Sequence, residues 1–297
     1  MEYVGKDFGL LLMDKPAGLT SHDVVNVARR ALGTKAIGHT GTLDPFATGL
    51  LVLATGRATK LMPYLEKSEK TYEAVMVLGL TTDTLDMTGA ITEESDCLDL
   101  SDESISDSIQ GFIGPMKQKV PAYSAVKKDG KKMYEYARKG QNMPDIPARE
   151  IMINNISVKN IQRNNNGKIE VSFETSVSKG TYIRQLAYDI GQRLKTPACL
   201  KELRRIKVGA YSIEDAFNMD ELAAKEFRFS DPLDGINLPE LVVSKETAGI
   251  ISDGGFLDTD LFGGKTDTVL RDRTGKPLAI YRFDKERNVM RMAVKLL

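Results

Sequence analysis

The chain is poor in the residues that most often bind metals. Its 297 residues include only two histidines and two cysteines, His22, His39, Cys97 and Cys199, and nothing in their spacing suggests a metal site. Because zinc sites are built mainly from histidine and cysteine, a zinc site of this kind is disfavoured. We therefore expect no metal and no other cofactor. In a reducing compartment the two cysteines would remain free thiols.

The sequence also lacks a hydrophobic run long enough to cross a bilayer. Residues 1–7 contain neither the basic segment nor the following apolar segment of a secretory signal peptide. These absences predict a cytoplasmic protein that does not enter a membrane. Hydrophobic residues make up 41% and charged residues 28% of the chain, as in ordinary globular proteins. The length predicts one large domain plus a small one, or two domains.

An excess of either charge is absent as well, since 41 Lys and Arg balance 41 Asp and Glu. RNA-binding proteins are often basic, so this balance argues mildly against an RNA partner. The charges are segregated, however, because residues 71–116 contain no Lys or Arg and basic groups follow. Local basic patches suffice for phosphate contacts, although a single charged run is more often a solvated face. The two basic groups are Lys117, Lys119, Lys127, Lys128, Lys131, Lys132, Arg138 and Lys139, and then Lys201, Arg204, Arg205 and Lys207.

Residues 38–49 have the most unusual composition in the chain. They combine three glycines, three threonines and a proline with a single carboxylate, Asp44. Gly and Pro interrupt helices and strands, and Thr hydrogen-bonds to nearby backbone, so this stretch predicts a tightly turned loop that holds one acid in place. The composition alone fits an ordinary connecting loop equally well, because Asp-Pro pairs often start turns.

Periodicity on both sides of this loop predicts an α+β fold. Apolar runs at residues 8–13 and 50–54 indicate buried strands. Apolar residues at helical spacing predict a helix that begins at Thr20 or Ser21 and ends at Gly33. The other predicted elements are a short helix at 55–65, a strand at 72–78, a helix at 101–112, a hairpin formed by 151–161 and 168–177, and a helix from Ile183 to Leu194.

The C-terminal part is predicted to be a separate unit. Residues 231–235, Asp-Pro-Leu-Asp-Gly, indicate a linker. Beyond it, a short helix near 244–251 and strands around 268–271, 278–283 and 289–294 are separated by turns. This pattern predicts a small β-barrel.

The stretch from His39 to Gly49 is similar to the catalytic loop of the TruB family, bacterial tRNA pseudouridine synthases that modify the T loop. Other segments that resemble the family occur in its order, over residues 8–211, so the likeness is stronger than one short motif. Ile206 is a departure, because the family often has threonine there. The other segments are the Lys-Pro-x-Gly-x-Thr-Ser turn at 15–21, Thr-Thr-Asp-Thr-Leu-Asp at 81–86, the Pro-Ala-Tyr-Ser-Ala-Val-Lys stretch from Pro121, Ser-Lys-Gly-Thr-Tyr-Ile-Arg at 178–184, and 199–211 with Leu-Arg-Arg.

The resemblance implies the pseudouridine synthase fold, with a mixed, largely antiparallel central sheet flanked by helices. It implies a catalytic domain at residues 1–234 and a PUA-like RNA-binding β-barrel at 235–297. The implied reaction is the isomerisation of uridine to pseudouridine in the T loop of tRNA, at position 55 by the family's assignment, with the base flipped out of the stack. The implied partner is the T-arm stem-loop, bound by a monomer that needs no protein partner.

The resemblance also implies site residues. Asp44 would be the catalytic carboxylate, Tyr72 would lie against the target base, and Arg184 would keep Asp44 ionised. Without the resemblance, Tyr72 would be interpreted as a core aromatic at the start of a strand. The sequence leaves open whether Asp44 attacks C6, attacks C1′ or abstracts a sugar proton. The residues implied to bind substrate are His39, Tyr182, Leu203, Lys15, Lys127 and Lys128.

Some of these implied contacts have alternatives. Lys15 would lie near RNA or near the Asp44 loop, or it would be a solvated lysine in a turn. His39 would insert where the flipped base was, or it would hydrogen-bond within the loop. Lys127 and Lys128 belong to residues 117–149, a basic insertion with interleaved tyrosines that would clamp the T-arm hairpin. In the family, the leucine that matches Leu203 lines the base pocket.

Two other functions are weaker hypotheses. An RNA chaperone would use the same surface without chemistry, but a pure binder has no need for a buried acid paired with an arginine. A guide-RNA-dependent relative that acts on ribosomal RNA is disfavoured, because the insertion at 117–149 would take the place of guide and partner proteins.

Overall fold

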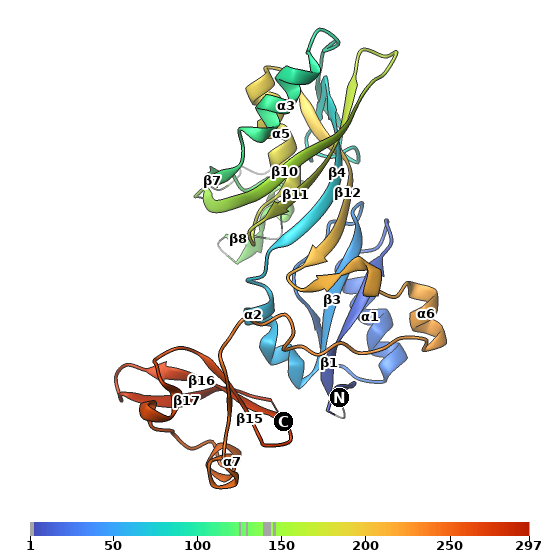
Figure 1. Cartoon of the computed structure of the whole chain (residues 1–297). Coiled ribbons are helices and arrows are strands. Elements are labelled where there is room, and N and C mark those ends of the chain that lie inside the picture. Colours follow the sequence, from blue (N-terminus) through green and yellow to red (C-terminus); the bar gives the residue numbers. More distant parts are fainter. Residues whose placement is uncertain (1–2, 125, 129, 139–143, 145–146, 297) are drawn as a thin grey trace.

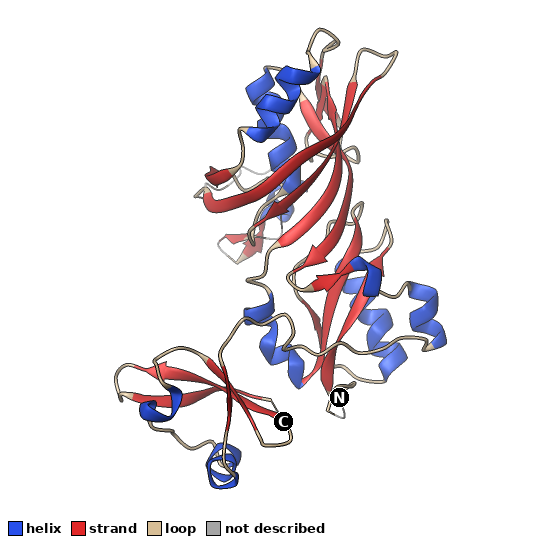
Figure 2. Ribbon diagram, in the orientation of Figure 1, coloured by secondary structure: helices blue, strands red, loops and turns tan. Residues whose placement is uncertain are grey.

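The computed structural model describes residues 3–124, 126–128, 130–138, 144 and 147–296. It shows a large mixed α+β part and a smaller C-terminal unit (Figures 1 and 2). Nine strands form the central sheet in the order β1-β3-β12-β4-β11-β10-β7, with β2 beside β3 and β13 beside β12. These strands are β1 (Phe8–Lys15), β2 (Ile37–His39), β3 (Thr48–Gly56), β4 (Lys70–Leu78), β7 (Gly114–Gln118), β10 (Arg149–Arg163), β11 (Ile169–Val177), β12 (Ala198–Val208) and β13 (Tyr211–Ser212).

The central sheet is antiparallel except between β12 and β3. β12 pairs with β4 along most of its length, but it pairs with β3 only at Arg204↔Thr48 and Arg205↔Gly49. The sheet therefore has two lobes joined at β12: one contains β1, β2 and β3, and the other contains β4, β7, β10 and β11 (Figure 1). The predicted mixed, largely antiparallel sheet is confirmed.

Helices cover the sheet in both lobes (Figure 1). Leu186 and Ile190 of α5 and Ile105 of α3 pack on the lobe of β4, β10 and β11, while Val24 of α1 and Leu222 of α6 pack on β1 and β3. The helices are α1 (Ser21–Leu32), α2 (Met62–Leu65), α3 (Asp102–Gln110), α4 (Met133–Arg138), α5 (Ile183–Leu194), α6 (Met219–Ala224) and α7 (Lys245–Ser252), with 3-10 turns η1 (Arg57–Leu61), η2 (Ile213–Asp215) and η3 (Thr259–Phe262).

Local sequence determines both ends of α1. The Thr20 side chain accepts a hydrogen bond from the Asp23 amide, and the Asp23 carboxylate accepts one from the Thr20 amide. This capping box satisfies amide groups that the first turn leaves free. Gly33 ends the helix at φ 62°, a conformation that glycine adopts without steric cost. The predicted helix is confirmed at both ends.

The loop around Asp44 is shorter than its composition predicts. Gly38 and His39 belong to β2, and Thr48 and Gly49 begin β3. The prediction that none of residues 38–49 lies in a strand is therefore wrong at both ends. Backbone pairing of His39 with Leu53 continues the sheet there, and such pairing can overcome weak local propensity. Residues 40–47 remain irregular, and Asp44 lies among them.

The C-terminal unit is not a closed barrel in the part of the chain that the structure describes. Its strands form an open sheet in the order β14-β15-β16-β17, with only a single bridge, Leu257↔Met290, on the far side of β17. Closure would require the first and last strands to pair, and these strands are only three to eight residues long. The predicted β-barrel is therefore corrected to a four-stranded sheet. Its strands are β14 (Glu240–Val242), β15 (Thr268–Arg271), β16 (Pro277–Asp284) and β17 (Val289–Lys295).

Two small ribbons complete the fold. β5 (Leu80–Thr82) pairs with β6 (Ile91–Glu94), and β8 (Lys127–Lys128) pairs with β9 (Lys131–Lys132). The second ribbon and α4 belong to the predicted insertion at 117–149. Residues 125, 129, 139–143 and 145–146 of that insertion lie outside the described residues.

Gly49 is expected to tolerate no side chain, because it lies where the two lobes meet. Its φ is +99°, and an added Cβ would lie 2.3 Å from the carbonyl oxygen of Arg205. We expect Gly49→Ala to lower the free energy of unfolding by roughly 2–3 kcal/mol, because both backbone strain and overpacking act there. The measurement is urea denaturation followed by circular dichroism.

Gly275→Ala is the matched control. Gly275 has a similar φ of +84°, but an added Cβ there would meet no atom within 4 Å. It therefore reports backbone strain alone, which we expect to cost about 1 kcal/mol. Equal losses in the two variants would contradict the close approach of β3 and β12.

Candidate active site

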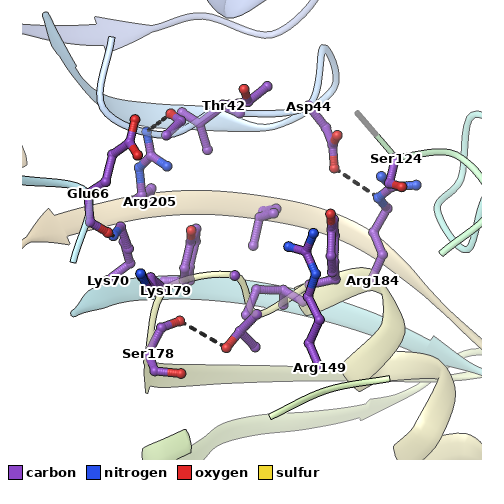
Figure 3. Close-up of a pocket in the computed structure, with 18 of the residues that line it drawn as sticks. Thr42, Asp44, Glu66, Lys70, Ser124, Arg149, Ser178, Lys179, Arg184 and Arg205 are labelled. Atoms are coloured by element: carbon purple, nitrogen blue, oxygen red, sulfur yellow. Dashed lines mark hydrogen bonds and ion pairs between the residues drawn. The ribbon is translucent and has the colours of Figure 1, made fainter. Parts of the chain in front are cut away.

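A cavity of about 800 Å³ lies between the Asp44 loop of one lobe and the elements of the other. β4 contributes Tyr72, β12 contributes Leu203 and Arg205, and the start of α5 contributes Arg184 and its N-cap residue Tyr182. Figure 3 shows Arg184 and Arg205 together with Asp44. The structure thus brings together Asp44, Tyr72, Tyr182, Arg184 and Leu203, which are far apart in the sequence. The volume of the cavity is within the range of sites that bind small molecules.

Asp44 and Arg184 form an ion pair in this cavity, although 140 positions separate them. Arg184 Nε donates a hydrogen bond to Asp44 Oδ2 at 2.8 Å (Figure 3). Nη1 donates to the carbonyl of Thr84 at 2.7 Å, and Nη2 donates to the carbonyl of Tyr123 at 2.8 Å. Every nitrogen of the guanidinium is therefore engaged, so the position of Arg184 is fixed.

Asp86 is a further member of this network. Its Oδ2 lies 3.5 Å from Arg184 Nη1, and the two side chains are only 6% and 5% exposed. Its Oδ1 accepts hydrogen bonds from Thr84 Oγ1 and from the amide of Thr88. The sequence placed Asp86 in a segment that resembles the family but assigned it no role. Only the fold buries Asp86, so no signal in the sequence indicated this role.

Electrostatics at Asp44 depend on two opposing effects. The side chain is 35% exposed, and this exposed part faces the cavity. Burial raises the pKa of Asp44 above its ordinary value, and the Arg184 guanidinium is the strongest influence that lowers it again. The Asp86 carboxylate adds to the rise. Arg184 is thus the main group that favours the ionised form of Asp44.

Lys15 supports the Asp44 loop through hydrogen bonds to backbone carbonyls. Its side chain is completely buried, and Nζ donates to the carbonyls of Pro16 and Leu19 at 2.8 Å and of Pro45 at 3.3 Å. Burial lowers the pKa of Lys15 to about 8. The two hypotheses of a solvated lysine and of a lysine open to RNA do not fit this position, whereas a place near the loop does.

Two more side chains hold the loop, and the sequence did not indicate either role. Ser21 Oγ accepts from the amide of Leu43 and donates to its carbonyl. Arg205, 1% exposed, donates from Nε to the carbonyl of Leu50 and from Nη2 to that of Gly41. These contacts anchor both ends of the loop, so Asp44 lies on a rigid support.

The apolar and aromatic wall comes from strand positions that face the cavity. Tyr72 and Leu203 are each 8% exposed and lie on neighbouring strands, β4 and β12. Tyr182 precedes α5, where Gln118 accepts from its amide at 2.8 Å and donates to its carbonyl at 3.0 Å. The Gln118 amide group thereby fixes the start of α5 and hence the direction of Arg184.

His39 lies apart from this wall, since the cavity lining that the structure describes does not include it. His39 ends β2, where its backbone pairs with Leu53 of β3. Its Nδ1 is buried without a hydrogen-bond partner among the described residues. Burial lowers the pKa of His39, and the nearby Arg205 adds to this shift. Insertion into RNA and hydrogen bonding within the loop therefore both stay predictions.

Lys127 and Lys128 lie in β8 with exposed side chains. Their ribbon belongs to the same insertion as Tyr123, whose carbonyl accepts a hydrogen bond from Arg184.

In the described part of the chain, no cluster of three or more His, Cys, Asp or Glu side chains is arranged to hold a metal ion. Within the same residues, no helix combines the length and apolar character needed to span a membrane. Cys97 and Cys199 are buried free thiols.

The chain is similar to known proteins over most of its length. Residues 29–183 match the family described as TruB family pseudouridylate synthase (N terminal domain), and 184–248 match the tRNA pseudouridylate synthase B C-terminal domain. A protein of Thermosipho melanesiensis named tRNA pseudouridine synthase B is 40% identical over 89% of this chain and 85% of its own. One of the same name from Oceanobacillus iheyensis is 40% identical over 92% of both chains.

Solved structures share the fold at lower sequence identity. A structure of an H/ACA RNP bound to a substrate RNA containing 2′-deoxyuridine gives a TM-score of 0.71 at 20% identity, over 98% of this chain and 86% of that one. The archaeal box H/ACA sRNP Nop10-Cbf5 complex gives 0.70 at 20% identity, with the same coverage. At this identity the likeness concerns the fold alone.

Proposed function

The chain belongs to the TruB family of tRNA pseudouridine synthases, and we propose that it isomerises the T-loop uridine at position 55 of tRNA with Asp44 as the catalytic carboxylate. The observation that carries this proposal is the ion pair of Asp44 and Arg184, 2.8 Å long, in a cavity walled by Tyr72 and Leu203. An acid held in this way can act on a base that has left its stack.

A tRNA substrate is favoured over a guide-directed one. The relatives named tRNA pseudouridine synthase B are 40% identical to this chain, whereas the proteins from H/ACA complexes are 20% identical. The chain also carries its own basic insertion at 117–149, which would hold the T-arm hairpin. We therefore propose that a monomer acts on the T arm without a guide RNA or a protein partner.

The reaction breaks the N1–C1′ bond, turns the uracil and joins C5 to C1′. Asp44 can promote it as a nucleophile at C6, as a nucleophile at C1′, or as a base that abstracts a sugar proton. Each route needs the ionised carboxylate. Arg184 favours that form, and Asp86 fixes Arg184 from its other side. We assign Asp44 the chemical step and treat Arg184 and Asp86 as the groups that set its charge and position.

The wall residues would hold the detached uracil and exclude water. Water that reached C1′ would hydrolyse the glycosidic bond, so an apolar wall that includes Leu203 serves the chemistry. Tyr72 lines the same wall from the neighbouring strand β4, and it would stack on the base or carry the proton from C5. Tyr182 would form the side of the cleft next to Arg184. Lys15 and Arg205 would act indirectly, because they hold the Asp44 loop.

We also propose a division at residues 234 and 235 into a catalytic domain and an RNA-binding unit. The C-terminal unit has its own apolar core, which includes Val243, Leu270 and Tyr281. A second core joins it to the first lobe, since Val269, Ile280 and Leu296 belong to an apolar cluster that also contains Ala58 and Leu61 of η1 and residues of β1 and β3. This contact would orient the unit so that it can bind another part of the same tRNA.

Expression in a bacterial strain without T-loop pseudouridine tests the proposal. We expect the chain to restore pseudouridine at position 55, mapped by chemical labelling and primer extension on purified tRNA. Restoration at other RNA positions, with position 55 left as uridine, would contradict the proposed substrate.

Charge reversal of the insertion should weaken binding without changing chemistry. Lys127→Glu combined with Lys128→Glu removes two exposed cations that would lie near phosphates. We expect KM for a T-arm hairpin to rise about tenfold and kcat to remain unchanged. The slope of the logarithm of the binding constant against the logarithm of the salt concentration should decrease in magnitude by about two. Binding by fluorescence anisotropy at several salt concentrations measures this.

The control reverses two exposed lysines outside the insertion, Lys35 before β2 and Lys225 after α6, which belong to the lobe that contains β1 and β3. We expect their combined reversal to change KM by less than about twofold, because long-range effects are screened by salt. An equal loss in both double variants would indicate a general electrostatic effect rather than contact by β8.

A further inference from the structure

Ser124 is an unusual residue in the wall of the cavity. It is only 4% exposed, it lines the cavity, and its Oγ has no hydrogen-bond partner among the described residues. A buried hydroxyl is normally paired, because its lost contact with water must be replaced. Other described hydroxyls share this lack of a partner, namely Thr40, Thr81 and Thr196, but the described lining of the cavity includes none of them.

The backbone on both sides of this hydroxyl is fixed. The carbonyl of the preceding residue, Tyr123, accepts from Arg184 Nη2 at 2.8 Å, and the carbonyl of Ser124 itself accepts from the amide of Tyr134 at 3.1 Å. Ser124 therefore lies next to the guanidinium that binds Asp44, as Figure 3 shows. The side chain is held beside the place where the reacting base must lie.

The neighbouring polar groups are already engaged. Arg184 uses Nε for Asp44, Nη1 for Thr84 and Nη2 for Tyr123. Asp86 is occupied by Arg184 and by the threonines at 84 and 88. Ser124 Oγ is thus a donor at this end of the cavity with its capacity unused. A uracil that enters brings two carbonyl oxygens that have lost water and need such a donor.

We propose that the Ser124 hydroxyl recognises the flipped uracil by donating a hydrogen bond to one of its carbonyl oxygens. This inference rests on the proposed function, since it assumes that a uridine occupies the cavity. It gives the insertion a second task, because the segment that would clamp the T arm also carries a contact to the target base. Ser124 would then couple seating of the hairpin to placement of the base beside Asp44.

The test combines variants of Ser124 with altered substrates in single-turnover reactions. T-arm hairpins carry uridine, 2-thiouridine or 4-thiouridine at the target position, and sulfur accepts hydrogen bonds more weakly than oxygen. With uridine, we expect Ser124→Ala to lower the rate about tenfold, as expected for a lost hydrogen bond that leaves a buried acceptor unpaired. With one of the two thio substrates, the ratio of wild-type to variant rate should fall below about threefold.

The control is Thr196→Val, which removes another buried, unpaired hydroxyl at a position outside the described lining and should leave all three rates unchanged. Ser124→Cys replaces the hydroxyl with a slightly larger thiol, a weak hydrogen-bond donor, and is used if Ser124→Ala does not fold, as judged by thermal unfolding. A Ser124 variant as fast as wild type, or one slowed equally on all three hairpins, would overturn the proposal. Failure of the proposed function is distinguishable, because wild type itself would then make no pseudouridine.

Discussion

Asp44→Asn is expected to reduce pseudouridine formation by at least about a thousandfold while the protein still binds the T arm. Asparagine keeps the size of the side chain, and its amide oxygen can still accept from Arg184 Nε, which now binds the Asp44 carboxylate at 2.8 Å. It has no negative charge, however, so it can neither attack the nucleotide nor abstract a proton. The measurement is the single-turnover rate on a T-arm hairpin, with the Kd measured in parallel.

The matched control is Asp14→Asn. Asp14 also pairs with an arginine, Arg204, at 2.7 Å, but this pair is roughly one-third exposed and the described lining of the cavity does not include it. Exposed pairs of this kind contribute about 1 kcal/mol or less, so the rate should change little. A rate for Asp44→Asn within threefold of wild type would show that this carboxylate is not catalytic.

Arg184→Gln should lower the rate about a hundredfold and move the acid limb of the pH–rate profile to higher pH. Arg184 is the strongest influence that lowers the pKa of Asp44, and burial already raises it. Its removal therefore raises the pKa further. Activity requires the ionised acid and is lost as pH falls through this pKa, so the loss begins at a higher pH in the variant.

Stability should fall as well, because Asp44 and Asp86 would face each other without the cation between them. Arg184 and Asp86 are buried on both sides of their pair, at 5% and 6% exposed, and removing one partner of such a pair typically costs about 3–5 kcal/mol. Arg184→Lys keeps the charge but cannot reach Asp44, Thr84 and Tyr123 together, so it should restore the pH profile more than the rate. Arg204→Gln is the control, with no shift of the acid limb expected. An unchanged acid limb in Arg184→Gln would contradict the role of Arg184.

Local signals predicted much of the fold. The capping residues of α1, the hairpin of residues 151–161 and 168–177 and the helix from Ile183 to Leu194 were predicted from local patterns, and the structure has elements at these places. The open C-terminal sheet could not be predicted in this way. Strand and turn patterns indicate which segments are strands, but they do not determine whether the two edge strands meet.

The same distinction between local patterns and distant contacts applies to the residues of the candidate site. Asp44 and Arg184 could be named from motifs, and the structure places them in contact. The burial of Lys15 and the anchoring role of Arg205 could not, because both depend on contacts with distant backbone, such as the Arg205 bond to Leu50 across 155 positions. Asp86 was missed for the same reason. A charged residue in a polar segment is usually exposed, and only the fold buries this one.

The most direct test of the account uses the purified wild-type chain and an unmodified T-arm hairpin with no other component. Pseudouridine is located at single-nucleotide resolution after a single turnover. The account predicts complete conversion of one uridine, the one equivalent to position 55, without a guide RNA or a protein partner. A hairpin that binds tightly yet remains unconverted would contradict it and would identify the chain as an RNA-binding module.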